Sequence, residues 1–295
     1  MRITRPAGSL IEILVVIAIL ALLTGLTLAG IQRARLAAAR ARCDNNLRQI
    51  GIAAHQYAAV YGTFPPGVSY KNDTDPFPFM GWPTRLLPYL EQTPLWDQAV
   101  SAFEIDKDFL DNPPHYGLTI ALPAFSCPLD SRTAQAQTLT GGVQRGLTSY
   151  LGMEGWNAAR PDGMLYLNSA VRLADVTDGA SNTLLVGERP ASTDMVFGWW
   201  YAGWGQDKDG EGDMVLGART KNNKTYAPSC PVGPYDYKPG NLDNQCDAFH
   251  FWSLHPGGTP FLFVDGSVHL VPYSANPIFP ALASRAGGET VSLPD

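Results

Sequence analysis

The fold is decided by the stretch Ser9-Leu-Ile-Glu-Ile-Leu-Val-Val-Ile-Ala-Ile-Leu-Ala-Leu-Leu23. Glu12 is its only charged residue, and no charge follows from Ile13 to Ile31. These nineteen residues form about 28 Å of helix at ~1.5 Å per residue, enough to cross the hydrocarbon core of a bilayer. The stretch therefore predicts a membrane-spanning helix with a carboxylate at its edge, and such a charge is a candidate functional group.

The residues before this helix indicate that it stays on the mature chain. Arg2 and Arg5 precede the small residues Ala7, Gly8 and Ser9. An ordinary secretory signal carries its small-residue cleavage site after the apolar core, which is then discarded. Here the small residues come first, so cleavage among them would leave the helix in place.

This arrangement resembles the N-terminus of type IV prepilins and pseudopilins. The resemblance implies that a prepilin peptidase removes the leader after a Gly, that the new N-terminus is methylated, and that a Glu occupies the fifth mature position. Cleavage at Gly8–Ser9 puts Glu12 at position four, and cleavage at Ala7–Gly8 puts it at five, so both sites stay open. Glu12 is then expected to pair with the N-terminal amine of a neighbouring pilin-like subunit during assembly. The alternative is a residue that only reaches the lipid headgroups.

Five further segments and a closing motif extend the resemblance along nearly the whole chain. Together they are similar to the DUF1559 family of prepilin-like proteins, whose C-terminal signature is a His followed after nine residues by Asp-Gly. The segments are Cys43-Asp-Asn-Asn-Leu-Arg-Gln-Ile-Gly, Tyr61-Gly-Thr-Phe-Pro-Pro-Gly, Leu87-Pro-Tyr-Leu-Glu-Gln, Phe125-Ser-Cys-Pro and Asp178-Gly-Ala-Ser-Asn-Thr, and the closing residues are His255, Asp265 and Gly266.

Composition favours an exported protein and argues against nucleic acid as a partner. Apolar residues make up 45% and charged residues 16% of the 295 residues, and the net charge is −6. Phosphate binding needs a basic surface, which an acidic chain lacks. The cluster Arg33, Arg35, Arg40 and Arg42 follows the span directly, so a headgroup-facing stripe explains it better. Basic residues flank the span on both sides, and the cysteines and the resemblance favour one pass through the inner (cytoplasmic) membrane with the C-terminal domain exported.

Hydrophobic spacing predicts one helix over residues 10–61. Its second half carries a single apolar stripe, and Gly62 with Pro65-Pro66-Gly67 ends it. We therefore divide the chain into a leader (1–8), a membrane and assembly helix (9–31), its amphipathic continuation (32–62) and an exported domain (63–295). The stripe consists of Cys43, Leu47, Ile50, Ala54, Tyr57 and Tyr61.

After residue 63 the pattern indicates an α+β domain: a long pilin-like helix packed on a mainly antiparallel sheet with long loops at 70–80 and 205–244. Residues 260–264 and 267–271 flank Asp265-Gly266, the strongest hairpin signal in the chain. Short helices are expected at 86–92 and 94–103. Further strands are expected at 118–125, 148–151, 163–167, 183–188 and 196–200.

The four cysteines predict two disulfides, because an even count in an exported domain is typical of them. Cys43 lies on the helix stripe, so a bond to Cys127 would join helix and sheet. Cys230 and Cys246 bracket a loop that a second bond would close. The alternative is a zinc site in which His250 and His255 join Cys230 and Cys246, but the tight Cys-x₂₋₄-Cys spacing of structural zinc sites is missing.

Asp207-Lys-Asp-Gly-Glu-Gly-Asp213 resembles the first half of a calcium loop. Asp207, Asp209, Glu211 and Asp213 place carboxylates at alternate positions. The bidentate Glu expected at the twelfth position is replaced by Ala218. Calcium is therefore a possible cofactor here, and a solvated acidic turn is the alternative.

No residue pattern predicts catalysis, and we expect no enzymatic activity. Ser253, His255 and Asp265 suggest a triad, but no nucleophile elbow or oxyanion hole accompanies them. A structural role for His255, Asp265 and Gly266 around the hairpin turn is the simpler interpretation. An aromatic cluster precedes the acidic loop and belongs either to the core or to a sugar-stacking surface; it consists of Trp199, Trp200, Tyr201 and Trp204. The chain is thus expected to be a filament or secretion-apparatus subunit, with an envelope-tethered binding module for glycan, calcium or protein as the alternative.

Overall fold

The computed structural model describes residues 10–72, 74–139, 142–289, 291 and 293–294. It divides the chain into two compact units, one ending at Ala41 and the other running from Arg42 to Asp295. The division lies inside helix α1 (Leu10–Tyr61), whose bounds match the helix predicted from hydrophobic spacing. Gly62 ends the helix with a φ of +79°, and its amide donates to Ala58 O at 2.9 Å. The expected leader residues Ala7, Gly8 and Ser9 lie outside the described residues.

The first unit is an apolar helical segment. The large apolar side chains that the structure describes in this unit are exposed, with Leu10 at 83% and Leu22 at 66%. By length and composition, α1 is the helix in the described chain that can cross a membrane. The hydroxyls of Thr24 and Thr27 donate hydrogen bonds to backbone carbonyls one turn earlier in the helix. Neither hydroxyl is therefore left as an unpaired donor among apolar side chains.

The second unit is built on a five-stranded sheet with strand order β5-β3-β4-β6-β7. All neighbouring pairs are antiparallel except β3 and β5, which are parallel. The mainly antiparallel α+β fold is thus confirmed. The sheet strands are β3 (Tyr150–Gly155), β4 (Leu184–Glu188), β5 (Val215–Gly217), β6 (Gly258–Phe263) and β7 (Val268–Pro272); β1 (Gln137–Thr138) and β2 (Gln144–Arg145) pair separately. The helices beyond α1 are α2 (Trp82–Arg85), α3 (Thr93–Ile105) and α4 (Phe279–Ala283).

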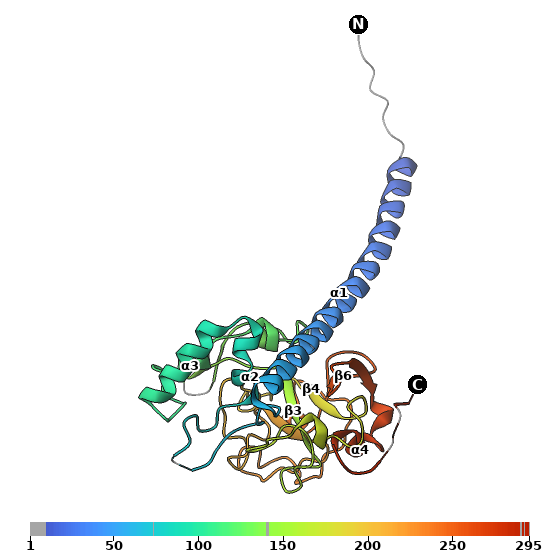
Figure 1. The fold of residues 1–295 in the computed structure, drawn as a ribbon. Helices are drawn as coiled ribbons and strands as arrows, with labels where there is room; N and C mark the ends of the chain where they lie inside the picture. The colour runs from blue at the N-terminus through green and yellow to red at the C-terminus, as the bar shows by residue number, and fades with distance from the viewer. Residues whose placement is uncertain (1–9, 73, 140–141, 290, 292, 295) are drawn as a thin grey trace. The chain divides into compact units, whose positions relative to one another are not determined.

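Both faces of the central strands are covered, which explains why β3, β4 and β6 are buried along their whole length. Leu262 and Val264 face a core that contains Leu47 and Ile50 of α1. The alternate residues Phe261 and Phe263 belong to a second core that includes Phe279 and Leu282 of α4. Figure 1 shows β3, β4 and β6 beside the C-terminal end of α1. Each large apolar side chain buried this way contributes about 1.5–3 kcal/mol.

Three predicted strands are wrong. Residues 118–125 form two short 3₁₀ turns, η2 (Tyr116–Thr119) and η3 (Pro123–Phe125). Their apolar pattern reflects burial of Leu118, Leu122 and Phe125 in the core, and Pro123 has no amide to donate to a sheet. Residues 163–167 and 196–200 make only isolated bridges, at Leu167 and Trp199. The β6–β7 pairing confirms the predicted hairpin. Helix α3 confirms the helix predicted at 94–103.

Candidate functional site

A cavity of about 950 Å³ opens between four loop segments of the globular unit, and its wall mixes aromatic and polar side chains. Trp204 is 36% exposed at this cavity and lies edge-on to Phe109, with ring centroids 5.5 Å apart. Its aromatic lining consists of Tyr70, Phe79, Phe109, Trp204 and Tyr226, and its polar lining includes Asn72, Lys107, Asp108, Gln206, Asp207 and Lys208. Exposed aromatic faces beside hydrogen-bonding groups suit an amphipathic ligand.

Hydrogen bonds hold the first loop of this wall in place. Asn168 Oδ1 accepts a hydrogen bond from the Tyr70 amide at 2.9 Å, and Asn168 Nδ2 donates one to the Tyr70 carbonyl at 2.7 Å. Tyr70 in turn stacks on Phe79 with centroids 4.4 Å apart. Lys107 Nζ donates to the carbonyls of Asp75 and Pro76 at 3.0 and 2.8 Å. The cavity wall is therefore fixed by side chains distant in sequence.

The predicted aromatic cluster divides between core and cavity. Trp200 and Tyr201 are buried, at 0% and 1% exposure, whereas Trp204 lines the cavity. Burial raises the pKa of Tyr201 above its usual range. Its hydroxyl contacts His115 Nδ1 at 2.8 Å. Trp199 is half-buried, with the Arg145 guanidinium 4.9 Å from its ring centroid, so Trp204 is the member of the cluster that offers its ring to the cavity.

The acidic loop forms part of the cavity wall but turns most of its carboxylates inward. Gln206, which lines the cavity, donates through Nε2 to Glu211 Oε2 at 2.7 Å. Thr220 Oγ1 donates to the other oxygen of Glu211 at 2.9 Å. Asp213 accepts the Gly205 amide at 2.8 Å, and Asp209 accepts the Glu211 amide at 2.9 Å. These bonds fold the loop onto itself.

Burial raises the pKa values of these inward carboxyls. The pKa of Glu211 rises to about 8, because burial and the charge of Asp209 both disfavour its ionised form. Burial raises the pKa of Asp213 to about 7, while the charge of Arg189 acts in the opposite direction. Burial and the Glu211 charge also raise the pKa of Glu154 well above its usual range.

The expected calcium ligands Asp207, Asp209, Glu211 and Asp213 do not act as one outward-facing set. Asp207 is exposed and accepts from Asn223 Nδ2 at 2.8 Å, whereas Glu211 and Asp213 are buried. Among the described residues, the potential metal ligands that lie within 4.8 Å of one another are Cys43, Cys127, Glu188 and His255. Calcium binding at the acidic loop stays a prediction.

Cys43 and Cys127 form a disulfide with Cα atoms 5.3 Å apart, which confirms the pairing expected between helix and domain. Asn46, less than one turn further along α1, donates to Pro123 O and Ser126 O at 3.0 and 2.9 Å. His255 lies against this disulfide, with Nε2 3.5 Å from Cys127 Sγ. The helix is therefore tied to the domain by a covalent bond and a polar clamp.

Asp265 and Gly266 form the β6–β7 turn. Asp265 Oδ1 accepts the Ser267 amide at 2.9 Å, and Gly266 adopts a φ of +86°, which favours Gly. The turn lies against α1: a Cβ on Gly51 would be 2.9 Å from Leu262 Cδ1 and 3.7 Å from Gly266 Cα. A groove of about 550 Å³ separates α1 and this turn beside His55.

The two ends of the His–Asp-Gly motif thus lie beside the same helix, α1. His255 lies at the disulfide of Cys43, and Gly266 lies at Gly51, about 12 Å further along α1. The His255 side chain contacts Cys127 and Glu188, so it lies at the disulfide and not at the hairpin turn where a structural role was expected. The Asp265 carboxylate accepts a hydrogen bond from the backbone of the β6–β7 turn in which it lies.

A family model described as "Protein of unknown function (DUF1559)" matches residues 32–277, which is most of the chain. The chain belongs to the DUF1559 family. The match begins after the apolar run and contains both ends of the His255–Gly266 motif of this DUF1559 protein. The comparisons with curated proteins and with solved structures gave no match.

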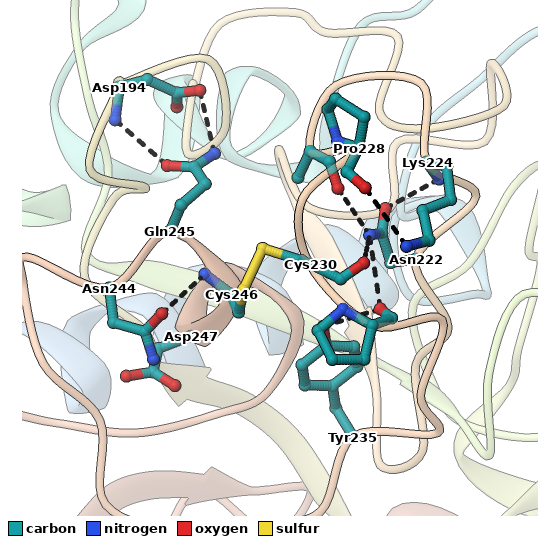
Figure 2. Close-up of a disulfide and its surroundings, with 12 residues drawn as sticks. Asp194, Asn222, Lys224, Pro228, Cys230, Tyr235, Asn244, Gln245, Cys246 and Asp247 are labelled. Carbon is teal, nitrogen blue, oxygen red and sulfur yellow. Dashed lines mark hydrogen bonds between the residues drawn. A yellow bond between two sulfur atoms is a disulfide. The ribbon is translucent and has the colours of Figure 1, made fainter.

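The second disulfide of this DUF1559 protein joins Cys230 and Cys246 and closes the long loop, as expected. Figure 2 shows Asn222 beside it, where Nδ2 donates to the carbonyls of Ala227 and Cys230 at 2.8 and 3.1 Å. His250 contacts Asp247 and Phe251 O, each at 3.0 Å. The alternative zinc set of Cys230, Cys246, His250 and His255 is therefore not assembled.

Sequence reasoning missed Glu188, Glu154 and the aromatic residues from distant loops. Glu188 ends a strand and is 1% exposed. A carboxylate at the end of an apolar strand is a weak signal, and nothing in its local sequence shows that the first disulfide lies beside it. Tyr226 and Phe109 reach the cavity from loops that carry no shared motif.

Proposed function

We propose that this protein is a prepilin-like, membrane-anchored exported protein that acts as a subunit or accessory of a type IV pilus-like filament or a type II secretion-like apparatus. The observation that carries the proposal is the division within α1. The described large apolar side chains between residues 10 and 31 are exposed, whereas Cys43, Leu47 and Ile50 are buried in the exported domain. One helix can thus serve as both membrane anchor and assembly element. In this proposal the protein acts through assembly and not as an enzyme.

In this proposal a prepilin peptidase cleaves at Ala7–Gly8 or Gly8–Ser9, and Glu12 pairs with the amine of a neighbouring pilin-like subunit. Glu12 lies in the first turn of α1, which supports this role. Pairing would compensate two charges that are costly near an apolar phase. The chain is then placed in the inner membrane with residues 42–295 exported.

The test combines processing and assembly. Intact mass and N-terminal sequencing of envelope protein should show loss of residues 1–7 or 1–8 and a methylated amine. Glu12→Ala should abolish recovery in sheared filaments while the domain keeps both disulfides, and Glu104→Ala, which removes an exposed acid on α3, is the matched control. A full-length N-terminus, or unchanged incorporation of the Glu12→Ala chain, refutes the proposal.

The cavity favours a second candidate, an envelope-tethered module that binds carbohydrate. Trp204 and Tyr226 supply partly exposed rings, at 36% and 39%, and amide and carboxylate groups line the same cavity. Sugars present apolar ring faces for stacking and hydroxyls for such polar groups. Calcium or protein ligands have no comparable support from this cavity.

Trp204→Ala should weaken binding of envelope glycan fragments about fivefold, since an exposed aromatic contact contributes about 1 kcal/mol. Trp156→Ala is the matched control, because Trp156 is 37% exposed and does not line the cavity. Binding is measured by saturation-transfer NMR and by glycan pull-down. Equal binding by both variants and the wild type would remove the cavity as a glycan site.

A further inference from the structure

Four side chains of metal-ligand type converge around the first disulfide. One ligand atom from each of Cys43, Cys127, Glu188 and His255 lies within 4.8 Å of the others. All four residues are buried, with exposures of 0%, 1%, 1% and 4%. They come from α1, the segment after η3, the end of β4 and the loop before β6. Tertiary folding alone brings them together.

The Glu188 carboxylate gives independent evidence for a cation beside this disulfide. Its Oε1 accepts the Ser253 hydroxyl at 2.9 Å, and Ser253 Oγ accepts the His255 amide at 2.9 Å. Its Oε2 is buried and has no hydrogen-bond partner in the described part of the chain. That oxygen lies 3.5 Å from His255 Nε2, which is also 3.5 Å from Cys127 Sγ. A buried carboxylate oxygen left without a donor is costly unless a cation satisfies it.

We propose that Cys43, Cys127, Glu188 and His255 form a Zn²⁺ site when the Cys43–Cys127 disulfide is reduced. Two thiolates, one imidazole nitrogen and one carboxylate oxygen are the ligand types of four-coordinate zinc, and Ca²⁺ and Mg²⁺ prefer all-oxygen sites. Zinc–sulfur bonds of about 2.3 Å in a tetrahedron separate the two sulfurs by about 3.8 Å. The disulfide and the zinc site are therefore alternatives that share the same two sulfurs.

The change between the two states needs a dithiol reductant and Zn²⁺. A dithiol reductant gives two electrons and two protons to the Cys43–Cys127 bond and leaves as its own disulfide. Zn²⁺ then displaces one proton from each protein thiol into solvent, and His255 binds as the neutral imidazole. The zinc-bound chain keeps α1 attached to Cys127 and Glu188. A chain not yet oxidised, or one that has been reduced, thus retains the clamp on its helix.

The test uses the full chain in detergent, in a Cys230→Ser/Cys246→Ser background that removes the other thiols. The chain is reduced with a phosphine, incubated with Zn²⁺ or Co²⁺ and desalted without oxygen. We expect one Zn²⁺ per chain, and for Co²⁺ a thiolate charge-transfer band with the intense visible absorption of tetrahedral coordination. The oxidised chain should retain neither metal, because its two sulfurs are bonded to each other.

Two variants identify the ligands. Cys43→Ser/Cys127→Ser should abolish retention of zinc. Glu188→Gln still offers an acceptor to Ser253 and should weaken zinc binding by at least about tenfold, the lower range for groups that only support a ligand. Circular dichroism reports folding of each variant, and the Co²⁺ spectrum of the reduced background chain needs no ligand substitution. The proposal is overturned if that reduced chain retains no zinc, if the Cys43→Ser/Cys127→Ser chain retains as much, or if Glu188→Gln binds with unchanged affinity.

Discussion

Stability of the globular domain should fall as pH rises from 5 to 8, and Glu211 is the residue that we expect to dominate this effect. Its pKa is about 8 in the folded chain against an ordinary value of 4.5. Below pH 4.5 both folded and unfolded chains hold the proton. Above it, the unfolded chain releases the proton while the folded chain keeps it until pH 8. Rising pH therefore favours the unfolded state.

The magnitude follows from the same two pKa values. Between pH 5 and pH 8, the Glu211 contribution to the free energy of unfolding decreases by about 3 kcal/mol. For a domain of this size, that lowers Tm by roughly 6–12 °C. Glu211→Gln should remove this loss, because the amide does not titrate between pH 5 and pH 8 and its oxygen can still accept the hydrogen bond from Gln206 Nε2. The variant should thus equal the wild type at pH 5 and exceed it at pH 8.

The assay is a pair of thermal melts of the full chain in detergent at pH 5 and pH 8, followed by near-ultraviolet circular dichroism. Glu104→Gln, on the exposed face of α3, is the control and should keep the wild-type pH dependence. The reasoning is refuted if wild type and Glu211→Gln lose the same stability over this range, or if the wild type gains stability as pH rises.

Three further predictions follow from the loops and from helix docking. Ca²⁺ should raise Tm at pH 8 and leave it unchanged at pH 5 if the acidic loop binds it, since a bound cation favours ionised carboxylates; a flat Tm at both pH values contradicts calcium binding. Cys230→Ala/Cys246→Ala removes a bond across 16 residues and should cost about 3 kcal/mol in a denaturant titration, and an unchanged midpoint would show that the loop closes without it. Gly51→Leu should cost about 1–3 kcal/mol through overpacking against Leu262, whereas Gly30→Leu, which meets no atom within 4 Å, should not destabilise the domain; equal melts of the two variants would contradict close docking of α1.

Features with a strong local signal were predictable. The β6–β7 hairpin was found because Asp265-Gly266 is a turn sequence between two apolar runs. The strand predicted at 118–125 failed because its apolar residues are buried in 3₁₀ turns, and burial and strand geometry leave the same short pattern. Pairing of Cys43 with Cys127 was anticipated because Cys43 lies on the helix stripe that needs a cover.

The sequence by itself determined the long helix, its division into an apolar and an amphipathic half, and the family-wide motifs. These depend on spacing along the chain, which periodicity reports directly. Only the tertiary structure brought Glu188 and His255 to the first disulfide, and Trp204, Phe109 and Tyr226 to one cavity. The acidic loop shows the same limit, because its carboxylates repeat as calcium ligands do, yet burial and hydrogen bonding turn Glu211 and Asp213 inward. Long-range packing decides which neighbours a side chain meets, and no local pattern encodes those neighbours.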